Sequence, residues 1–409
     1  MVDLGIVMPV YKQKPAFLEA ALDSVLKQTY QNFKLIVVID GAPEMEPLVR
    51  KFLNGDRRAA ILSHGVNQGV AAALNTGFRP LLDTSGIDYL TWVSSDNVYY
   101  PRFLETLRHA LKKGPEELGL AYSSFQGIND EGVQLYDEQT LAAQRQYQSQ
   151  PTEKLLDSSL IGVSFMYKSR YARLIDGYEL VPVEDYDYWL RLTEHCEIKY
   201  IPVELIEYRV NSALSVSAML QTVAQHRKWR YTYHLARHRA RTRRGIAPAI
   251  TILYPLKEAN AQAIERIENL YEQTFSNYIC YVLDLSPDMR VTAELSSISH
   301  PLTDFKWFPN TSRPMALLHA VQMIQTPYSL ILGQNQFTDA MNLSIMYDEM
   351  QKAAPEVMSN YYTPDRTQLG YRHASMAAHD NAAIYDELFR RDYLVDYVKN
   401  HYMQMSDLV

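Results

Sequence analysis

The chain is poor in cysteine and has no long hydrophobic run. Its 409 residues include two cysteines, Cys196 and Cys280, too few for a disulfide framework or a four-cysteine zinc site. No segment approaches the roughly 20 apolar residues that a membrane-spanning helix needs. The first residues have no basic cluster followed by an apolar segment, so they do not resemble a signal peptide. These absences predict a cytoplasmic protein.

Acidic residues outnumber basic ones, except in a single segment. The formal net charge is −7, yet residues 226–244 contain eight Lys or Arg and no Asp or Glu, which leaves −15 on the remainder. An acidic body argues against nucleic-acid binding, which needs a broad positive surface. The basic segment could lie on an anionic membrane surface, at the inner face of the membrane, or pack as a bridge between two parts of the chain. The second reading is favoured because the segment has few large apolar residues.

Strands and helices alternate along the first half of the chain. Nearly continuous apolar runs at 4–10, 34–39 and 89–93 predict buried strands, and apolar residues recur at helical spacing between them. This alternation predicts an α/β fold with a mostly parallel sheet. Ligands of such sheets bind at the carboxyl ends of the strands. Asp40 and Asp96 each follow a predicted strand, so both should lie at that edge.

The second half of the chain repeats features of the first. Residues 273–278 (QTFSNY) mirror residues 28–33 (QTYQNF), and each segment follows an apolar strand, at 250–256 and at 4–10. Asp284 ends the next strand as Asp40 does, and Asn335 stands where Asp96 stands. This order predicts an internal duplication. We expect a first domain at 1–215, a basic helical connector at 216–247, and a second domain at 248–409.

Several short motifs of the first half occur in a recognisable order. They are Met8-Pro9-Val10-Tyr11, Ser24 to Tyr30, Val37 to Gly41, Asn67-Gln68-Gly69, Asn75-Thr76-Gly77 and Glu184-Asp185. In this order they resemble the inverting glycosyltransferases of family 2, and residues 92–101 are similar to the spore-coat polysaccharide branch, which suggests a role in sporulation. The resemblance implies a Rossmann-like GT-A domain, followed by a smaller, degenerate GT-A-like repeat that is not catalytic. That repeat would serve packing, homodimerisation or acceptor binding.

The resemblance also assigns a nucleotide-sugar site. Its expected residues are Pro9, Val10, Tyr11, Asp40, Asn67, Gly69, Asn75, Ser95 and Asp96. Asp40 would accept the imide N–H of a uracil or thymine ring, which lies between two carbonyls. The alternative is that Asp40-Gly41 simply forms a turn.

Asp96 would bind a divalent cation, Mn²⁺ or Mg²⁺, that neutralises the leaving diphosphate. The alternative is a turn or helix-capping residue. Three positions depart from the family pattern: Ser95 replaces an acidic residue, Leu74 an arginine and Asn211 a histidine. The first two departures predict weaker binding of the diphosphate or a changed donor. Asn211 is a poor metal ligand compared with histidine, so no role is assigned to it.

Catalysis by inversion needs one general base for the acceptor hydroxyl. The family pattern implies Asp185 as the base and Glu184 as a neighbour that tunes its pKa or holds the acceptor. The alternative is an ordinary acidic first turn of a helix. Trp189 could form the floor of the acceptor site, or it could belong to the hydrophobic core.

The expected function is transfer of a sugar from a UDP- or dTDP-sugar to a hydroxyl of a glycan, lipid-linked or protein acceptor. The alternative is a weakened pseudoenzyme that binds nucleotide sugars or glycans. A sugar-phosphate nucleotidyltransferase is disfavoured, because the loop from Pro9 to Pro15 lacks glycine.

Overall fold

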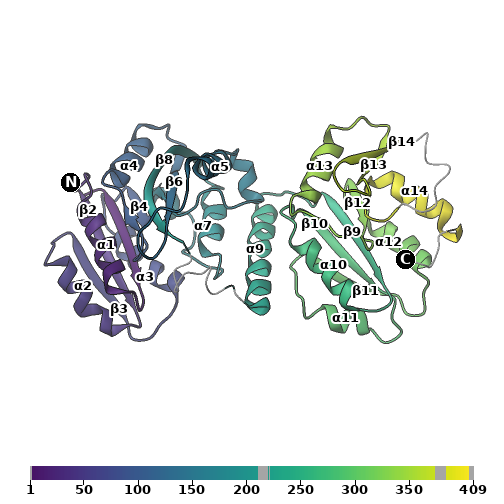
Figure 1. Cartoon of the computed structure of the whole chain (residues 1–409), viewed down its shortest axis with the longest axis horizontal. Coiled ribbons are helices and arrows are strands. Elements are labelled where there is room, and N and C mark those ends of the chain that lie inside the picture. The colour runs from purple at the N-terminus through teal and green to yellow at the C-terminus, as the bar shows by residue number, and fades with distance from the viewer. Residues whose placement is uncertain (1, 211–219, 221, 374–383, 405–409) are drawn as a thin grey trace. The chain divides into compact units, whose positions relative to one another are not determined.

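The computed structural model describes residues 2–210, 220, 222–373 and 384–404, and Asn211 lies outside them. The chain divides into two compact units, Met1–Ala236 and Arg237–Val409 (Figure 1). This division falls inside helix α9 (Val223–Arg243). Each unit is built around one sheet, so the expected α/β fold with a second sheet domain is confirmed.

The first unit contains an eight-stranded sheet in the order β3-β2-β1-β4-β7-β6-β8-β5. The strands β3, β2, β1 and β4 are parallel, β6 and β8 are parallel to each other, and β7 and β5 run antiparallel to their neighbours. Their bounds are β1 (Leu4–Val10), β2 (Phe33–Asp40), β3 (Ala59–His64), β4 (Tyr89–Trp92), β5 (Val98–Tyr99), β6 (Leu118–Ile128), β7 (Phe165–Lys168) and β8 (Glu197–Arg209).

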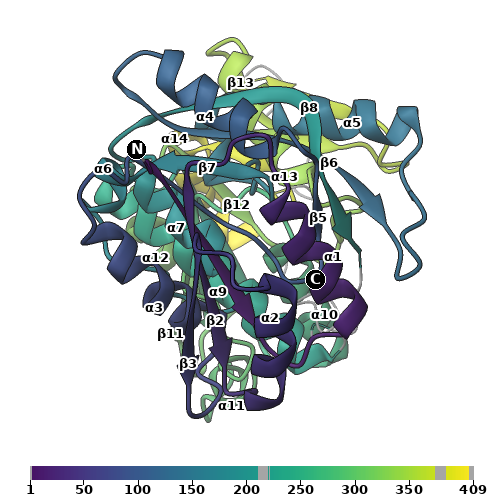
Figure 2. The ribbon, with the colours of Figure 1, turned by 90° about the vertical axis from the view of Figure 1, so that its left-hand side faces the viewer.

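Helices cover both faces of this sheet. Figure 2 shows α1 and α2 on one side of β1–β3 and α3 on the other. Gly77 of α3 faces Val7, and a Cβ at position 77 would lie 2.5 Å from Val7 Cγ1. The glycine of the Asn75-Thr76-Gly77 motif is thus explained by close helix–sheet packing. The helices are α1 (Pro15–Leu26), α2 (Glu46–Leu53), α3 (Val70–Leu82), α4 (Phe103–Lys113), α5 (Glu138–Gln148), α6 (Ser169–Ala172) and α7 (Glu184–Leu192).

The second unit repeats the topology of the first. Its sheet order, β11-β10-β9-β12-β15-β13-β14, matches β3-β2-β1-β4-β7-β6 over six strands, with the same parallel and antiparallel pairings. The strands are β9 (Ile250–Leu256), β10 (Tyr278–Asp284), β11 (Thr303–Trp307), β12 (Tyr328–Ile331), β13 (Val357–Tyr362), β14 (Leu369–His373) and β15 (Leu388–Arg390). The helices after α9 are α10 (Ala261–Tyr271), α11 (Arg290–Leu295), α12 (Arg313–Ala320), α13 (Asn342–Lys352) and α14 (Arg391–His401).

A buried glutamine performs the same task in both units. Gln28 Nε2 donates to a carbonyl just before α4 (2.8 Å), and its Oε1 accepts from the N–H of Leu104 (3.0 Å). Gln273 Nε2 donates to a carbonyl just before α13 (3.1 Å), and its Oε1 accepts from the N–H of Leu343 (3.0 Å). The repeated Gln-Thr sequence therefore has a physical cause, because each glutamine fixes the start of a helix. This agreement supports the duplication.

One expected correspondence is offset by a residue. In the first sheet Val10 is level with Ile39, and Asp40 lies one residue further on. In the second sheet Asp284 itself is level with Leu256, at the place of Ile39. Successive strand side chains point to opposite faces, so Asp284 is not the structural counterpart of Asp40. It instead accepts hydrogen bonds from Ser286 and from Thr292 in α11.

The basic segment at 226–244 lies in α9, and part of it is committed to packing. Arg241 Nη1 donates to Ser276 Oγ (2.9 Å), and Arg237 Nη1 donates to the carbonyl of Thr274 (3.1 Å). These two cations are buried within the second unit and are not available to a membrane surface. Among the described residues, no helix is both long enough and apolar enough to cross a membrane.

We expect Gln28→Ala and Gln273→Ala each to destabilise their own unit. Each substitution strips partners from a buried N–H and carbonyl, which costs about 1–3 kcal/mol per unsatisfied group. Urea unfolding with hydrogen exchange resolved by peptide measures the loss for each unit. Gln146→Ala, at an exposed position of α5, is the control, and losses no larger than in this control would contradict the shared role.

Candidate active site

The carboxyl edge of the parallel strands gathers most of the predicted site residues. Because β1 lies between β2 and β4 with all three parallel, Tyr11, Asp40 and the loop at 94–97 emerge at the same edge. His64, which ends β3, is level with Asp40. The sequence placed Asp40 and Asp96 at one edge, and the topology does so too.

The buried Asp40 carboxylate is the centre of the hydrogen bonding at this edge. Oδ1 contacts His64 Nδ1 (2.7 Å) and accepts from the N–H of Gln68 (2.9 Å). Oδ2 accepts from the N–H of Gly69 (2.9 Å) and from Asn67 Nδ2 (3.0 Å). A carboxylate offers about four acceptor positions, and four groups already occupy them. Asp40 therefore holds the Asn67-Gln68-Gly69 loop against the end of β2.

The residue after Asp40 must be glycine. Gly41 has a φ of +68°, and a Cβ there would lie 2.0 Å from the backbone nitrogen of Asn67. The two motifs, Asp40-Gly41 and Asn67-Gln68-Gly69, are therefore two halves of one local structure. Asp40 can therefore belong to a turn and also serve the predicted binding role, since the turn places its carboxylate at the carboxyl edge of the sheet.

The Pro9-Val10-Tyr11 motif splits into exposed and buried parts. Tyr11 is 38% exposed and Pro9 partly exposed, so both can face a ligand. Val10 is fully buried in the core beneath α1. Its side chain cannot line a nucleotide pocket, so the expectation for Val10 is restricted to its backbone.

The loop that carries Ser95 and Asp96 is held by Arg209 at the end of β8. Arg209 Nε donates to the carbonyl of Asp96 (3.1 Å), and its guanidinium stacks 3.8 Å over the ring of Phe17. Asn97 Oδ1 accepts the N–H of Arg209 (3.0 Å). Ser95 is buried, and its hydroxyl accepts from Gln13 Nε2 at 3.5 Å. These contacts position Asp96 without using its carboxylate.

Asp96 fits a shared cation better than a protein-only metal site. Across the described ranges, no group of three His, Cys, Asp or Glu side chains is arranged to hold a metal ion. Mg²⁺ and Mn²⁺ are commonly held by one or two carboxylates together with substrate phosphates. One carboxylate with a neighbouring serine matches that arrangement only when the diphosphate supplies the other ligands.

Glu184 and Asp185 open α7 and share a buried environment. Burial raises the pKa of Glu184. Burial, followed by the charge of Glu184, raises the pKa of Asp185 well above its ordinary value. Glu184 Oε2 and Asp185 Oδ1 are both buried without a hydrogen-bond partner among the described residues. The indole N–H of Trp92 is near enough to oppose the rise for Asp185, but it lies outside hydrogen-bonding geometry. The pair therefore differs from an ordinary acidic first turn, whose carboxylates face solvent.

Tyr208 connects this pair to Asp96 electrostatically. Its pKa is raised by burial first and then by the charges of Asp96, Tyr136 and Asp185. Tyr208 thus lies within electrostatic range of both Asp96 and Asp185. The expected cation ligand and the expected base are brought to one region, although they are 89 positions apart in the sequence.

Asn75 acts on the backbone near α7. Its amide donates to the carbonyl of Tyr178 (3.0 Å) and accepts the N–H of the same residue (2.7 Å). The ring of Tyr178 stacks on Tyr188 of α7 at 4.1 Å. Asn75 therefore positions the helix that carries Asp185, and its neighbour Leu74 is fully buried.

Trp189 belongs to the core. It is almost fully buried and packs edge-on against Phe165, with ring centroids 4.4 Å apart. The alternative role as a floor for the acceptor is therefore wrong. Asp187 on the same helix pairs with Arg191 at 2.8 Å.

Sequence reasoning missed His64, Trp92 and the supporting role of Arg209. His64 bridges Asp40 to Thr76 Oγ1, which lies 2.9 Å from Nε2. His64 lies at the end of β3, level with Asp40, and only the pairing of the two strands shows this. Trp92 and Arg209 both fall in segments that resemble family motifs, but the resemblance gave neither side chain a role, because their contacts lie across the sheet.

Part of this region resembles known glycosyltransferases. Residues 5–174 match the model of glycosyl transferase family 2. An uncharacterised glycosyltransferase of Rickettsia bellii is 27% identical over 222 residues, covering 51% of this chain and 30% of the relative. Glycosyltransferase GlyA of Streptococcus pneumoniae is 35% identical over 124 residues, covering 30% of this chain and 17% of that protein. The chain thus spans about a third or less of the length of these two relatives.

Two solved structures also resemble the chain. One is Staphylococcus aureus TarS 1–349 in complex with UDP-GlcNAc, at 11% identity and a TM-score of 0.44, covering 57% of this chain and 66% of that one. The other is the mannosyltransferase PcManGT of Pyrobaculum calidifontis with GDP-Man and Mn²⁺, at 15% identity and a TM-score of 0.42, covering 59% and 64%.

We expect Asp40→Asn to destabilise the first unit. The new amide would turn a donor toward the N–H groups that Asp40 now accepts, leaving buried donors unsatisfied at about 1–3 kcal/mol each. Urea unfolding measures the change, and Asp83→Asn at an exposed position after α3 is the control. Unchanged stability in Asp40→Asn would show that the carboxylate does not hold the loop.

Proposed function

We propose, from the glycosyltransferase family 2 domain at residues 5–174, that the first unit transfers a sugar from a UDP- or dTDP-sugar to an acceptor hydroxyl with inversion. The acceptor is a glycan, a lipid-linked saccharide or a protein. The observation that carries this proposal is the buried Glu184-Asp185 pair with its raised pKa values, in electrostatic range of the same tyrosine as Asp96.

The raised pKa suits Asp185 to act as a general base. An ordinary aspartate, with a pKa near 3.9, has little affinity for a proton at neutral pH. A carboxylate with a pKa closer to the working pH takes up the acceptor proton more readily. As the acceptor oxygen bonds to the anomeric carbon, its proton passes to Asp185, and the bond from that carbon to the diphosphate oxygen breaks. Burial keeps the pKa of Asp185 high, and the charge of Glu184 adds to that effect.

The donor would lie along the edge that Tyr11, Asp40 and Asp96 share. Asp96, with Ser95 beside it, would hold a divalent cation that neutralises the diphosphate as it leaves. Tyr11 offers an exposed ring against which a base can pack. Asp40 can meet an imide N–H only if one of its present partners gives way, so its larger role is to set the Asn67-Gln68-Gly69 loop.

A glycan-binding pseudoenzyme remains the second candidate, favoured by the single carboxylate at 95–96. Thermal melting with Mn²⁺ and a panel of UDP- and dTDP-sugars tests both readings, since a ligand of the native state raises its melting temperature. Stabilisation followed by release of nucleoside diphosphate supports transfer. Stabilisation with no release supports the pseudoenzyme.

Asp185→Asn should abolish transfer and leave donor binding intact. Loss of a general base costs about 10²–10⁴-fold in rate, while the nucleotide does not meet this side chain in our arrangement. Turnover is measured by release of nucleoside diphosphate, and donor binding by thermal shift. Asp176→Asn, at an exposed loop position, is the matched control. Turnover near that of the control would remove Asp185 from the mechanism.

The same variant should be more stable than the native chain near neutral pH. The folded state raises the pKa of Asp185, so it favours the protonated form and loses stability as pH rises from about 3.9 toward the folded value. The neutral amide avoids that loss. A gain of 1 kcal/mol corresponds to about 2–4 °C in melting temperature for a unit of this size, and the gain should vanish in acid.

The transfer rate of the native chain should rise as the pH rises from about 3.9 toward the pKa of Asp185 in the folded state, because Asp185 must lose its proton to act as a base.

Asp96→Asn should weaken the metal-dependent thermal shift given by a nucleotide. The amide keeps the size of the side chain but removes the charge that a hard cation prefers. The Mn²⁺-dependent part of the shift is the relevant measurement, with Asp83→Asn as the control. A shift equal to that of the native chain would exclude Asp96 from the cation site.

A further inference from the structure

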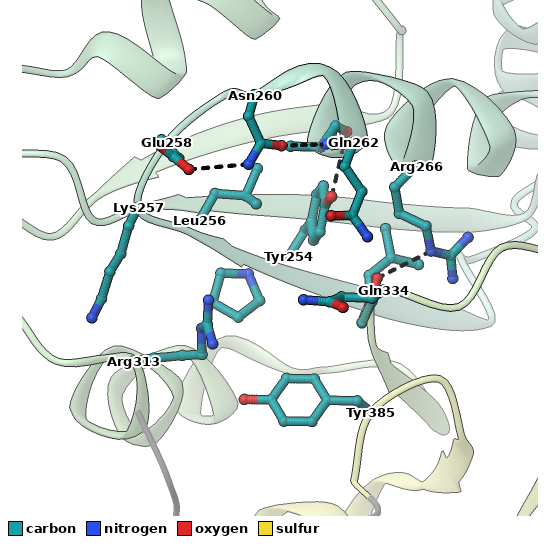
Figure 3. Close-up of a pocket in the computed structure, with 14 residues that line it drawn as sticks. Tyr254, Leu256, Lys257, Glu258, Asn260, Gln262, Arg266, Arg313, Gln334 and Tyr385 are labelled. Atoms are coloured by element: carbon teal, nitrogen blue, oxygen red, sulfur yellow. Dashed lines mark hydrogen bonds between the residues drawn. The ribbon is translucent and has the colours of Figure 1, made fainter. Parts of the chain in front are cut away.

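The second unit has its own cavity at the carboxyl edge of its sheet. The cavity has a volume of about 700 Å³ and is bordered by the ends of β9 and β12, the first turns of α10 and α12, and Tyr385. Figure 3 shows Arg313, Gln334 and Tyr385 pointing toward one region from three separate segments. All of its lining residues belong to the second unit.

The cavity occupies the place that the donor site has in the first unit. Pro255 and Leu256 end β9 as Pro9 and Val10 end β1. The N–H of Leu332 bonds to the carbonyl of Leu253 (2.8 Å), just as Val93 bonds to Val7 in the first unit (2.9 Å). Gly333 and Gln334 thus stand where Ser94 and Ser95 stand. The cavity therefore lies at the strand ends that correspond to the expected donor site.

The charge at this edge is of the opposite sign. Asn335 is neutral where the first unit has Asp96. Among the described residues that line the cavity, three are cations, Lys257, Arg266 and Arg313, and one is a carboxylate, Glu258. Arg266 is paired with Asp386 at 2.9 Å. Lys257 is exposed, while Arg313 is 9% exposed. Such a lining recognises an anion directly, whereas the first unit needs a cation between its carboxylate and a diphosphate.

The rest of the lining suits a sugar more than a nucleobase. Gln262 and Gln334 are exposed amides that can donate and accept hydrogen bonds with neighbouring hydroxyls, and Tyr254 supplies an aromatic wall. No carboxylate stands at the place of Asp40, because Asp284 is offset by one residue and bonded to α11. Lys257 occupies the position of Tyr11. The second unit therefore lacks counterparts of Asp40 and Tyr11, the two residues that we assign to nucleobase binding in the first unit.

We propose that this cavity binds a saccharide that carries a negative charge, a phosphate or a carboxylate, with Lys257 and Arg313 contacting the charged group and no divalent cation required. The glutamine amides contact the hydroxyls. This proposal does not depend on transfer by the first unit.

Calorimetric titration of the full chain in EDTA tests the proposal. The probes are glucose 1-phosphate and glucuronate, which separate the two sources of charge, with glucose and inorganic phosphate as comparisons. We expect at least one charged sugar to bind more tightly than both comparisons. Arg313→Gln and Lys257→Gln should each weaken that binding about tenfold or more, the loss of one charge-assisted contact. Lys257 is exposed, so Lys257→Gln keeps the test valid even if Arg313→Gln does not fold.

Two control variants distinguish binding in this cavity from binding elsewhere on the chain. Arg290→Gln removes an exposed cation of the second unit outside the cavity and should leave binding unchanged. Asp96→Asn should also leave it unchanged, whereas a change in either direction would assign the binding to the first unit. Failure of both charged sugars to bind, inorganic phosphate binding as tightly as the sugars, or equal binding in Lys257→Gln would each overturn the proposal.

Discussion

The Asp40 carboxylate is the interaction on which the edge of the first unit depends. Its oxygens are met by the ring of His64, the amide of Asn67 and two backbone N–H groups. A buried carboxylate without such partners would be costly, and the loop at 67–69 would have no reason to return to the end of β2. Since α3 begins at Val70, the same contacts also set the start of the helix that carries Asn75. Asn75 in turn holds Tyr178, whose ring packs on α7.

The second constraint is the free-energy cost of burying the carboxylates of Glu184 and Asp185 side by side. Burial disfavours the charged form of both carboxylates, and the charge of Glu184 adds to the effect on Asp185, so the pKa of each is raised. The other buried residues of α7 are mostly aromatic or aliphatic, and Asp187 is paired with Arg191. The carboxylate oxygens of Glu184 and Asp185 that lack a partner among the described residues therefore lower the stability of the fold locally, and perturbed pKa values of this kind are common at functional sites.

The sequence predicted those parts of the molecule that depend on local pattern. Apolar runs indicated the parallel strands, and the Gln-Thr repeat indicated the duplication, which the paired bonds of Gln28 and Gln273 now explain. The sequence could not show that Val10 points into the core, or that Asp284 is shifted by one residue in register relative to Asp40. Both depend on register, and one residue of slip reverses the direction of a side chain. The partnership of Tyr208 with Asp96 and Asp185 depends on how distant strands meet.

The two units show how one scaffold can support different electrostatics. A repeated scaffold keeps the edge at which its parallel strands end, while the side chains at that edge can change their charge. In the first unit Asp96 stands at this edge, so the anionic donor that we propose would approach together with a cation. In the second unit Arg313 and Lys257 place positive charge at the corresponding edge, as our second proposal requires. The neutral Asn335 at the position of Asp96 agrees with this difference. It places no negative charge beside a cavity that Lys257, Arg266 and Arg313 line.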